Sequence, residues 1–347
     1  MTTGTALGRG GGQQAPVVSA KTFPATYVLP LRRDRPDPSD AELAAYLARL
    51  SPHLEVIVVD ASPDPVYTAH AQLWGDTVTQ LRPAPELRCG NGKVWGVLTG
   101  LAAAGQEALV IADDDVRYDL PQLRTLVDAL AEADVVRPQN YFSPLPWHAR
   151  WDTARSLINR ATGADWPGTL AVRRSRLAGS GGYDGSVLFE NLELVRTVQS
   201  SGGRERVLAD LFVRRQPPSQ RQFWDQRVRQ AYDEFARPWR LAVWLGVVPL
   251  TVALAARRSW AGLAVFTASW VGLAELGRRR DSGRTVFPVS SSCLAPAWVL
   301  ERAICSWLAV GSRLCLGGVR YRGELLTRAA SSRAALRRRH LMGETRS

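Results

Sequence analysis

Short runs of apolar residues alternate with longer amphipathic stretches along the first part of the chain. The runs Tyr27–Leu31, Leu54–Asp60 and Ala108–Ala112 are rich in β-branched residues and too short for helices, so each predicts a buried strand. Apolar positions at helical spacing predict a helix at 41–50 and another that opens after Gly92. This alternation of strand and helix predicts an α/β fold with a mostly parallel sheet and helices on both of its faces.

The alternation ends at the segment Gln216-Pro-Pro-Ser219. Residues 23–219 are therefore expected to form one α/β domain. The other elements predicted within it are strands at Val78–Leu81, 134–139, 166–172 and 208–214, and helices at 121–133 and 147–161.

The pattern changes in the C-terminal third. Residues 220–240 mix aromatic side chains with arginines, which predicts an amphipathic helix at a membrane interface or, alternatively, a plain surface helix. Residues 241–256 and 259–274 are apolar and uncharged, although each is shorter than the ~20 residues of a typical membrane span. They predict a tilted hairpin in a membrane, two helices in its interface, or a buried helix pair of a soluble protein. Residues 286–316 are apolar but interrupted, which predicts an interfacial or re-entrant segment or a third span.

Charge narrows the choice of partners. The chain of 347 residues has a formal net charge of +12, most of it from arginine. A basic chain can bind nucleic acid, anionic lipid or an anionic substrate. Arginines border the apolar segments and crowd the C-terminus, so a membrane is the favoured partner and nucleic acid is not expected. Residues 241–318 are predicted to be membrane-associated helices, followed by a basic tail at 319–347.

Cysteine usage and the N-terminal sequence indicate the cellular compartment. The four cysteines show no paired or metal-ligand spacing, and the four histidines are not clustered. A reduced, cytosol-facing protein without a zinc site is therefore expected. Residues 1–22 lack the apolar core of a signal peptide and are predicted to be disordered. The predicted location is the cell membrane, with the α/β domain on its cytoplasmic side.

Three consecutive carboxylates, Asp113, Asp114 and Asp115, directly follow the predicted buried strand Ala108–Ala112. Such acids lie at the rim of the sheet, where open α/β sheets bind ligands. Their mutual repulsion would be relieved by Mn²⁺ or Mg²⁺, which takes one or two carboxylates together with diphosphate oxygens. Because strand side chains alternate, Asp113 and Asp115 are assigned to the metal and Asp114 to sugar or ribose hydroxyls. The alternative is a solvated turn that caps the helix before Pro121.

Other residues suit the binding of a nucleotide. Asp60, at the end of the second strand, can hydrogen-bond a ribose or base, or can simply begin a turn. Lys93 lies where a glycine-rich segment opens into a helix and can meet phosphate there, although the segment is not a Walker A motif. Either Arg227 or Arg229 could close over a diphosphate.

Two acids farther along the chain suit proton transfer. Glu190 and Glu193 are one helical turn apart and share a face. A general base near an acceptor hydroxyl would suit this position. The alternative is an ordinary amphipathic helix whose acids are solvated.

Several stretches together resemble a known protein family, and they occur in that family's order. These stretches are Val28–Leu31, Val58–Asp60, Gly92–Lys93 with Gly100–Ala104, Asp113–Val116, Gly181–Tyr183, Phe189–Asn191 and Gly318–Gly323. With them the chain is similar to the family 2 glycosyltransferases, and most similar to membrane-attached members resembling ceramide glucosyltransferase. The family's Gln-x-x-Arg-Trp motif is only echoed by Gln222–Arg227, so processive polysaccharide synthesis is not implied.

The resemblance implies the GT-A fold and a metal-dependent, inverting hexosyltransferase of glycolipid biosynthesis. The donor would be a nucleotide-sugar, with a UDP-hexose as the family-level expectation, and the acceptor a lipid or lipid-linked hydroxyl. Pro30 and Asp60 would hold the nucleoside, and Glu190 would be the base, although Asn191 stands where the family often has Asp. Two rival hypotheses are a sugar-phosphate nucleotidyltransferase and a non-catalytic membrane scaffold of the same fold.

Overall fold

The computed structural model describes residues 23–321 and 323–344. Its centre is an eight-stranded sheet with the strand order β3-β2-β1-β4-β7-β6-β8-β5. Pairs β1–β2, β1–β4, β2–β3 and β6–β8 are parallel, whereas β7 runs antiparallel to both of its neighbours and β5 runs antiparallel to β8. The predicted mostly parallel α/β fold is confirmed. The strands are β1 (Ala25–Leu31), β2 (Glu55–Asp60), β3 (Thr79–Leu81), β4 (Ala108–Ala112), β5 (Val116–Arg117), β6 (Val135–Phe142), β7 (Thr169–Arg173) and β8 (Glu205–Arg215).

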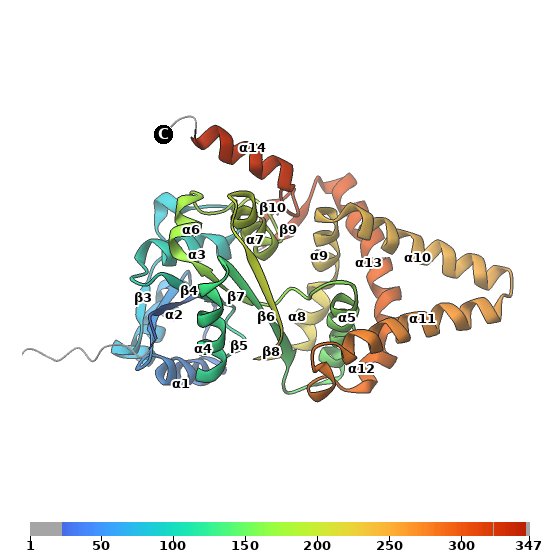
Figure 1. Ribbon diagram of the computed structural model, residues 1–347, viewed down its shortest axis with the longest axis horizontal. Helices are drawn as coiled ribbons and strands as arrows, with labels where there is room; N and C mark the ends of the chain where they lie inside the picture. The colour runs from blue at the N-terminus through green and yellow to red at the C-terminus, as the bar shows by residue number, and fades with distance from the viewer. Residues whose placement is uncertain (1–22, 322, 345–347) are drawn as a thin grey trace, which may run out of the picture.

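Helices cover both faces of this sheet (Figure 1). Along β1, Tyr27 and Leu29 pack with residues of α1 and α4, whereas Val28 points to the other face and packs with residues of α3 and α7. The strand is thus buried on both sides, which explains its continuous apolar sequence. The helices of this domain are α1 (Asp40–Leu50), α2 (Asp64–Trp74), α3 (Gly92–Ala103), α4 (Leu120–Asp128), α5 (Trp147–Thr162), α6 (Arg174–Gly179) and α7 (Glu190–Ser200).

Two glycines allow α3 to approach the sheet closely. A Cβ atom at Gly100 would lie 2.4 Å from Cγ1 of Val28, and one at Gly96 would lie 2.7 Å from Cβ of Pro30. Neither position has room for a side chain. At the start of the helix, the Asn91 side chain accepts a hydrogen bond from the backbone N–H of Lys93 (3.1 Å). These contacts fix where Lys93 projects.

The segment 220–240 is not the single amphipathic helix that the sequence predicts. It forms α8 (Gln220–Asp225), α9 (Arg227–Tyr232) and a short 3-10 turn, η4 (Asp233–Ala236). The reason is burial. Phe223, Arg227 and Tyr232 pack into the protein, so the segment follows the surface it covers rather than a membrane plane.

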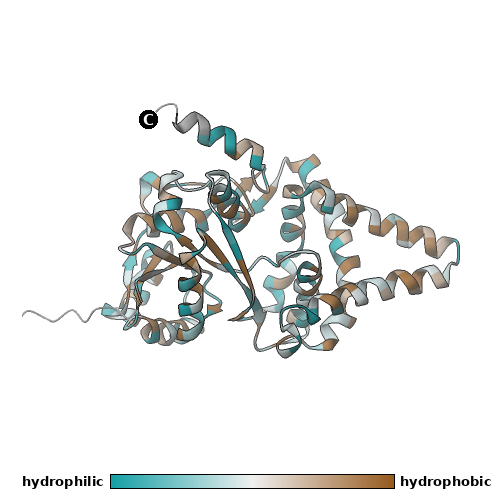
Figure 2. Ribbon diagram, in the orientation of Figure 1, coloured by the Kyte–Doolittle hydropathy of each residue, from teal (hydrophilic) through white to brown (hydrophobic). Residues whose placement is uncertain are grey.

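Beyond it, α10 (Pro238–Ala256) and α11 (Trp260–Arg279) form a hairpin that projects from the body of the protein (Figure 1). Apolar residues dominate both helices (Figure 2). Both are long and apolar enough to cross a membrane, and only 17% and 11% of their most apolar windows are buried. The alternative of a buried helix pair therefore does not hold.

The rest of the C-terminal third folds back on the body. Within the described residues, α12 (Val289–Cys293) and α13 (Ala295–Leu316) are not candidate spans, and α13 buries Trp298 and Ala303. A third span, one of the alternatives predicted for residues 286–316, is thus not found among the described residues. The predicted basic tail contains a strand pair, β9 (Val319–Tyr321) with β10 (Glu324–Leu326), and α14 (Arg333–Glu344), which packs on α7. Residues 1–22, predicted to be disordered, lie outside the described part of the chain.

A backbone contact joins the hairpin to α5. A Cβ atom at Gly277 in α11 would lie 1.8 Å from the carbonyl oxygen of Leu157. We expect Gly277→Ala to separate the two helices and lower the free energy of unfolding by about 1–3 kcal/mol, the usual cost of overpacking. Thermal unfolding of the purified protein in detergent measures this effect.

The matched control is Gly272→Ala in the same helix, because the Gly272 position has open space around it. That substitution should be neutral or slightly stabilising, since alanine favours the helix. Equal melting temperatures for the two variants would contradict the proposed close contact.

Candidate active site

A cleft of about 880 Å³ opens at the ends of β1, β4 and β8. Its size is that of a typical small-ligand site. The sequence-predicted residues Pro30, Lys93, Asp113, Asp114, Asp115 and Glu190 line it, together with Arg33, Arg215, Gln216, Arg229 and Asp233.

The three aspartates lie in the turn between β4 and β5 rather than on the strand, and they divide between two sets of partners. Arg215 contacts both Asp115 (Nε to Oδ2, 2.9 Å) and Asp113 (Nη2 to Oδ2, 3.3 Å). Asp114 instead pairs with Arg33. The alternative that the three aspartates cap the following helix is wrong, because Asp119 caps α4.

Burial and neighbouring charges shift the pKa values of two groups at this site. Burial raises the pKa of Asp115 to about 6, and the neighbouring Asp113 and Asp114 add to the rise, while Arg215 opposes it. Burial disfavours the charged form of Lys93, but Asp113 and Glu190 outweigh it and raise the pKa of this ammonium above its ordinary value. Lys93 Nζ lies 2.6 Å from Asp113 Oδ1 and 2.8 Å from Glu190 Oε1.

The donor set of this site fits a hard divalent cation. Asp113 and Asp115 converge on one cationic group, the Arg215 guanidinium, so their oxygens can share a single cation. In residues 23–321 and 323–344, no group of three or more His, Cys, Asp or Glu side chains could hold a metal. Two carboxylates suffice for Mg²⁺ or Mn²⁺ when phosphate oxygens and water complete the coordination.

Of the two acids at the start of α7, only Glu190 lies in the cleft. Glu193 is fully buried, and its Oε2 accepts a hydrogen bond from the backbone N–H of Ser331 (2.6 Å). Asn191 donates from Nδ2 to the carbonyl of Pro167 (3.0 Å), which anchors the helix start beside Glu190. Glu193, the second of the two acids predicted to suit proton transfer, therefore does not lie in the cleft.

Asp60 does not fit the predicted contact with a ribose or base. Its side chain is 0% exposed and does not line the cleft. One oxygen accepts from the backbone N–H of Ser62 (2.9 Å), and the other lies 3.0 Å from Gln80 Nε2 and 2.7 Å from His70 Nδ1. Asp60 is a structural residue that fixes the turn after β2, which agrees with the alternative prediction that it begins a turn.

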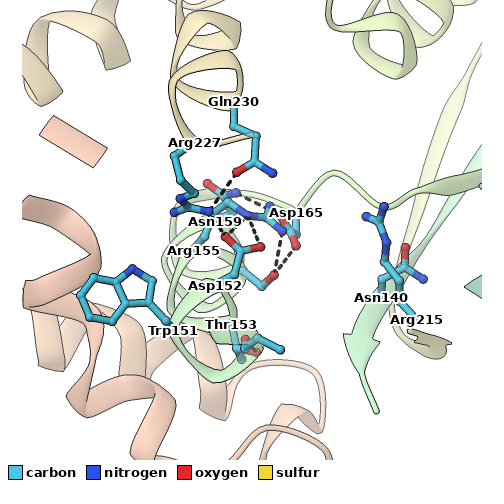
Figure 3. Close-up of polar contacts among 12 residues, drawn as sticks. Asn140, Trp151, Asp152, Thr153, Arg155, Asn159, Asp165, Arg215, Arg227 and Gln230 are labelled. Atoms are coloured by element: carbon cyan, nitrogen blue, oxygen red, sulfur yellow. Dashed lines mark hydrogen bonds and ion pairs between the residues drawn. The ribbon is translucent and has the colours of Figure 1, made fainter. Parts of the chain in front are cut away.

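Arg227 also lies elsewhere than predicted. It is 2% exposed and forms an ion pair with Asp152 (2.7 Å; Figure 3). It also forms an ion pair with Glu301. These contacts join α9 to α5 and α13. Of the two arginines predicted to close over a diphosphate, Arg229 is the one that lines the cleft. Its guanidinium lies 4.9 Å from the centre of the Tyr321 ring.

Removing the Arg227 side chain is expected to destabilise the fold. In Arg227→Ala, Asp152 and Glu301 would lose their shared cation, at a cost of about 3–5 kcal/mol for a broken buried pair. Chemical denaturation measures the loss. Arg221→Ala, at an exposed position in the same segment, is the control and should change stability by less than about 0.5 kcal/mol. Weakened nucleotide binding with unchanged stability would instead restore Arg227 to the donor site.

Arg215 and Asp233 are cleft residues that the sequence prediction missed. Arg215 is the last residue of β8. Ligand-binding groups are expected at strand ends along this edge of the sheet, so its position in the sequence could have indicated a role in the cleft. The sequence gives no such signal for Asp233, because residues 220–240 are predicted to form one continuous helix.

No protein-family model matches this sequence, and no curated protein matches it. Among solved structures, the chain is similar to the mannosyltransferase PcManGT from Pyrobaculum calidifontis, solved in complex with GDP-Man and Mn²⁺. The two are 17% identical, the match covers 85% of this chain and 91% of that one, and the TM-score is 0.52. The fold is of the GT-A type. At this identity the likeness shows the GT-A fold and not the reaction.

Two other solved structures match less of the chain. Glucosyl-3-phosphoglycerate synthase from Mycobacterium tuberculosis, in complex with Mn²⁺, UDP and phosphoglyceric acid, is 16% identical over 58% of this chain and 73% of that one, with a TM-score of 0.40. Mannosyl-3-phosphoglycerate synthase from Rubrobacter xylanophilus is 15% identical over 58% and 69%, with a TM-score of 0.38. Neither score is high enough to add to the GT-A assignment.

Proposed function

We propose that this protein is a glycosyltransferase that moves a sugar from a nucleotide-diphosphate donor to a lipid or lipid-linked hydroxyl. The observation that carries the proposal is a charge cluster in the large cleft of a GT-A fold, in which Arg215 pairs with Asp113 and Asp115 and Lys93 pairs with Asp113. Acids suited to a metal, beside cations suited to phosphate, are what a nucleotide-diphosphate donor needs.

Each group has a role in holding the donor. Asp113 and Asp115 would bind Mn²⁺ or Mg²⁺, which when bound offsets the charge that develops on the departing diphosphate. Lys93, Arg215 and Arg229 would contact phosphate oxygens directly. Asp114 and Pro30, which also line the cleft, would contact the sugar and the nucleoside.

The reaction is a single displacement with inversion. The acceptor oxygen attacks the anomeric carbon opposite the bond to the diphosphate. That bond breaks, and its electron pair leaves with the nucleoside diphosphate. The acceptor proton passes to a carboxylate of the cleft, for which Glu190 is the candidate from the sequence.

The lipid acceptor is supported by the exposed apolar hairpin of α10 and α11, which would hold the cleft at the cytosolic face of the membrane. This arrangement agrees with the resemblance to membrane-attached family 2 enzymes similar to ceramide glucosyltransferase. A UDP-hexose remains the proposed donor on that resemblance alone.

The deciding experiment uses the purified full-length chain in lipid with UDP- and GDP-sugars and Mn²⁺ or Mg²⁺. Metal-dependent transfer to extracted lipid, with release of the nucleoside diphosphate, is the expected result. Release of pyrophosphate from a nucleoside triphosphate and a sugar phosphate would instead identify a nucleotidyltransferase. Neither turnover nor metal-dependent nucleotide binding would leave the scaffold hypothesis.

A further inference from the structure

Besides Glu190 and the three aspartates, the cleft is lined by a further acid, Asp233. Asp233 is the first residue of η4, between α9 and the apolar hairpin, and it lines the same cleft as Glu190. Its Oδ1 atom is buried and has no hydrogen-bond partner among the residues that the structure describes. A buried carboxyl oxygen without a partner is costly to keep, which makes this atom available to a ligand hydroxyl.

Glu190, in contrast, is already engaged. Its Oε1 lies 2.8 Å from Lys93 Nζ, and the same ammonium lies 2.6 Å from Asp113. Protonation of Glu190 would remove half of the negative charge that holds Lys93 in place. Glu190 is therefore better suited to positioning Lys93 against a phosphate than to accepting a proton.

The surroundings of Asp233 favour proton exchange. Burial is the main reason that its pKa is raised, to about 8, with further contributions from Glu190 and Glu234 that Arg237 and Arg302 partly oppose. A general base works best when its pKa lies near the working pH.

We propose that Asp233 is the proton-accepting residue of the transfer reaction and that Glu190 acts through Lys93 as a positioning residue. This inference rests on the proposed glycosyltransferase function. The acceptor O–H bond breaks and its proton moves to Asp233 Oδ1. The acceptor oxygen bonds the anomeric carbon, whose bond to the diphosphate breaks with its electrons leaving on the nucleoside diphosphate.

The test compares Asp233→Asn and Glu190→Gln with wild type. For Asp233→Asn we expect kcat to fall by about 10²-fold, the lower range for loss of a general base. The donor KM and the Mn²⁺-dependent binding of nucleoside diphosphate, measured by calorimetry, should stay within about twofold of wild type because the phosphate-binding groups are untouched. For Glu190→Gln we expect the donor KM to rise, because Lys93 loses a partner. The control Asp225→Asn, at an exposed position in the same segment, should match wild type.

The pH profile separates a chemical role from a structural one. Wild-type kcat should rise with pH toward about 8, as Asp233 loses its proton. That rise should be absent in Asp233→Asn and return in part in Asp233→Glu. Because the folded-state pKa of Asp233 lies above its unfolded value, this residue destabilises the fold increasingly as the pH rises from about 4 to 8. The melting temperature of Asp233→Asn at pH 8 should therefore equal or exceed that of wild type, so its lost activity would not reflect unfolding.

Two results would overturn the inference. One is an Asp233→Asn variant with wild-type kcat and an unchanged pH profile. The other is a Glu190→Gln variant that loses kcat and the pH-dependent rise while keeping the donor KM. If wild-type protein turns over no donor, the glycosyltransferase function itself is overturned, and the assignment of Asp233 with it.

Discussion

Asp115→Asn is expected to lower the rate of metal-dependent sugar transfer by at least ~10³-fold, at the upper end of the cost of losing one preorganised electrostatic contact. Asp115 is one of the two carboxylates that converge on a single cation position in the cleft. Asparagine keeps the shape but removes the charge that would hold Mn²⁺ or Mg²⁺. The measurement is the initial rate of nucleoside diphosphate release with saturating donor, over a range of metal concentrations.

The control for this prediction is Asp128→Asn, on the exposed side of α4 and remote from the cleft, which should behave as wild type. Melting temperatures of both variants establish that each is folded. An Asp115→Asn variant with near wild-type turnover at low metal concentration would show that this carboxylate does not hold the metal.

Placing lysines at Val252 and Val265 is expected to release the protein from lipid vesicles. These side chains are 60% and 67% exposed on the hairpin. A lysine costs about 2.5–3.5 kcal/mol at the centre of a membrane helix. Even half of that cost at each position gives about 3 kcal/mol in total, or roughly 10²-fold in partitioning. Flotation of the purified double variant with anionic vesicles measures the change.

Val207→Lys is the matched control, because Val207 is a partly exposed valine on β8 outside the hairpin. It should leave vesicle binding unchanged. A double variant that still floats with vesicles would show that the hairpin is not the membrane anchor. The donor-binding assay in solution should remain normal in both proteins, since neither change touches the cleft.

Much of the sheet and the centre of the cleft could be predicted because the signals are local. The apolar run of β4 leads directly into Asp113, so strand and acid are defined by the same few residues. The predicted separation of Asp114 from its two neighbours agrees with its contact with Arg33, although the three residues form a turn and not a strand. Lys93 was predicted for a similar reason, since the glycines of α3 and the helix start are adjacent in sequence.

The failures concern residues whose environment depends on distant segments. Asp60 has the strand-end position of a ligand-binding acid, but His70 and Gln80 occupy its carboxylate from other elements. Arg227 was predicted to close over a diphosphate, but ion pairs with Asp152 and Glu301 hold it in the interior of the protein. Periodicity within one segment contains no information about these contacts, so neither burial could be predicted from the sequence.

The close approach of Gly277 to Leu157 has a mechanical consequence. Helix α11 touches α5 backbone to backbone, and α5 holds α9 through the ion pair of Asp152 with Arg227. Two residues further along α9, Arg229 enters the cleft. The hairpin is therefore connected to Arg229 through α5 and α9, so we expect a tilt of the hairpin to move Arg229 and with it this part of the lining of the cleft.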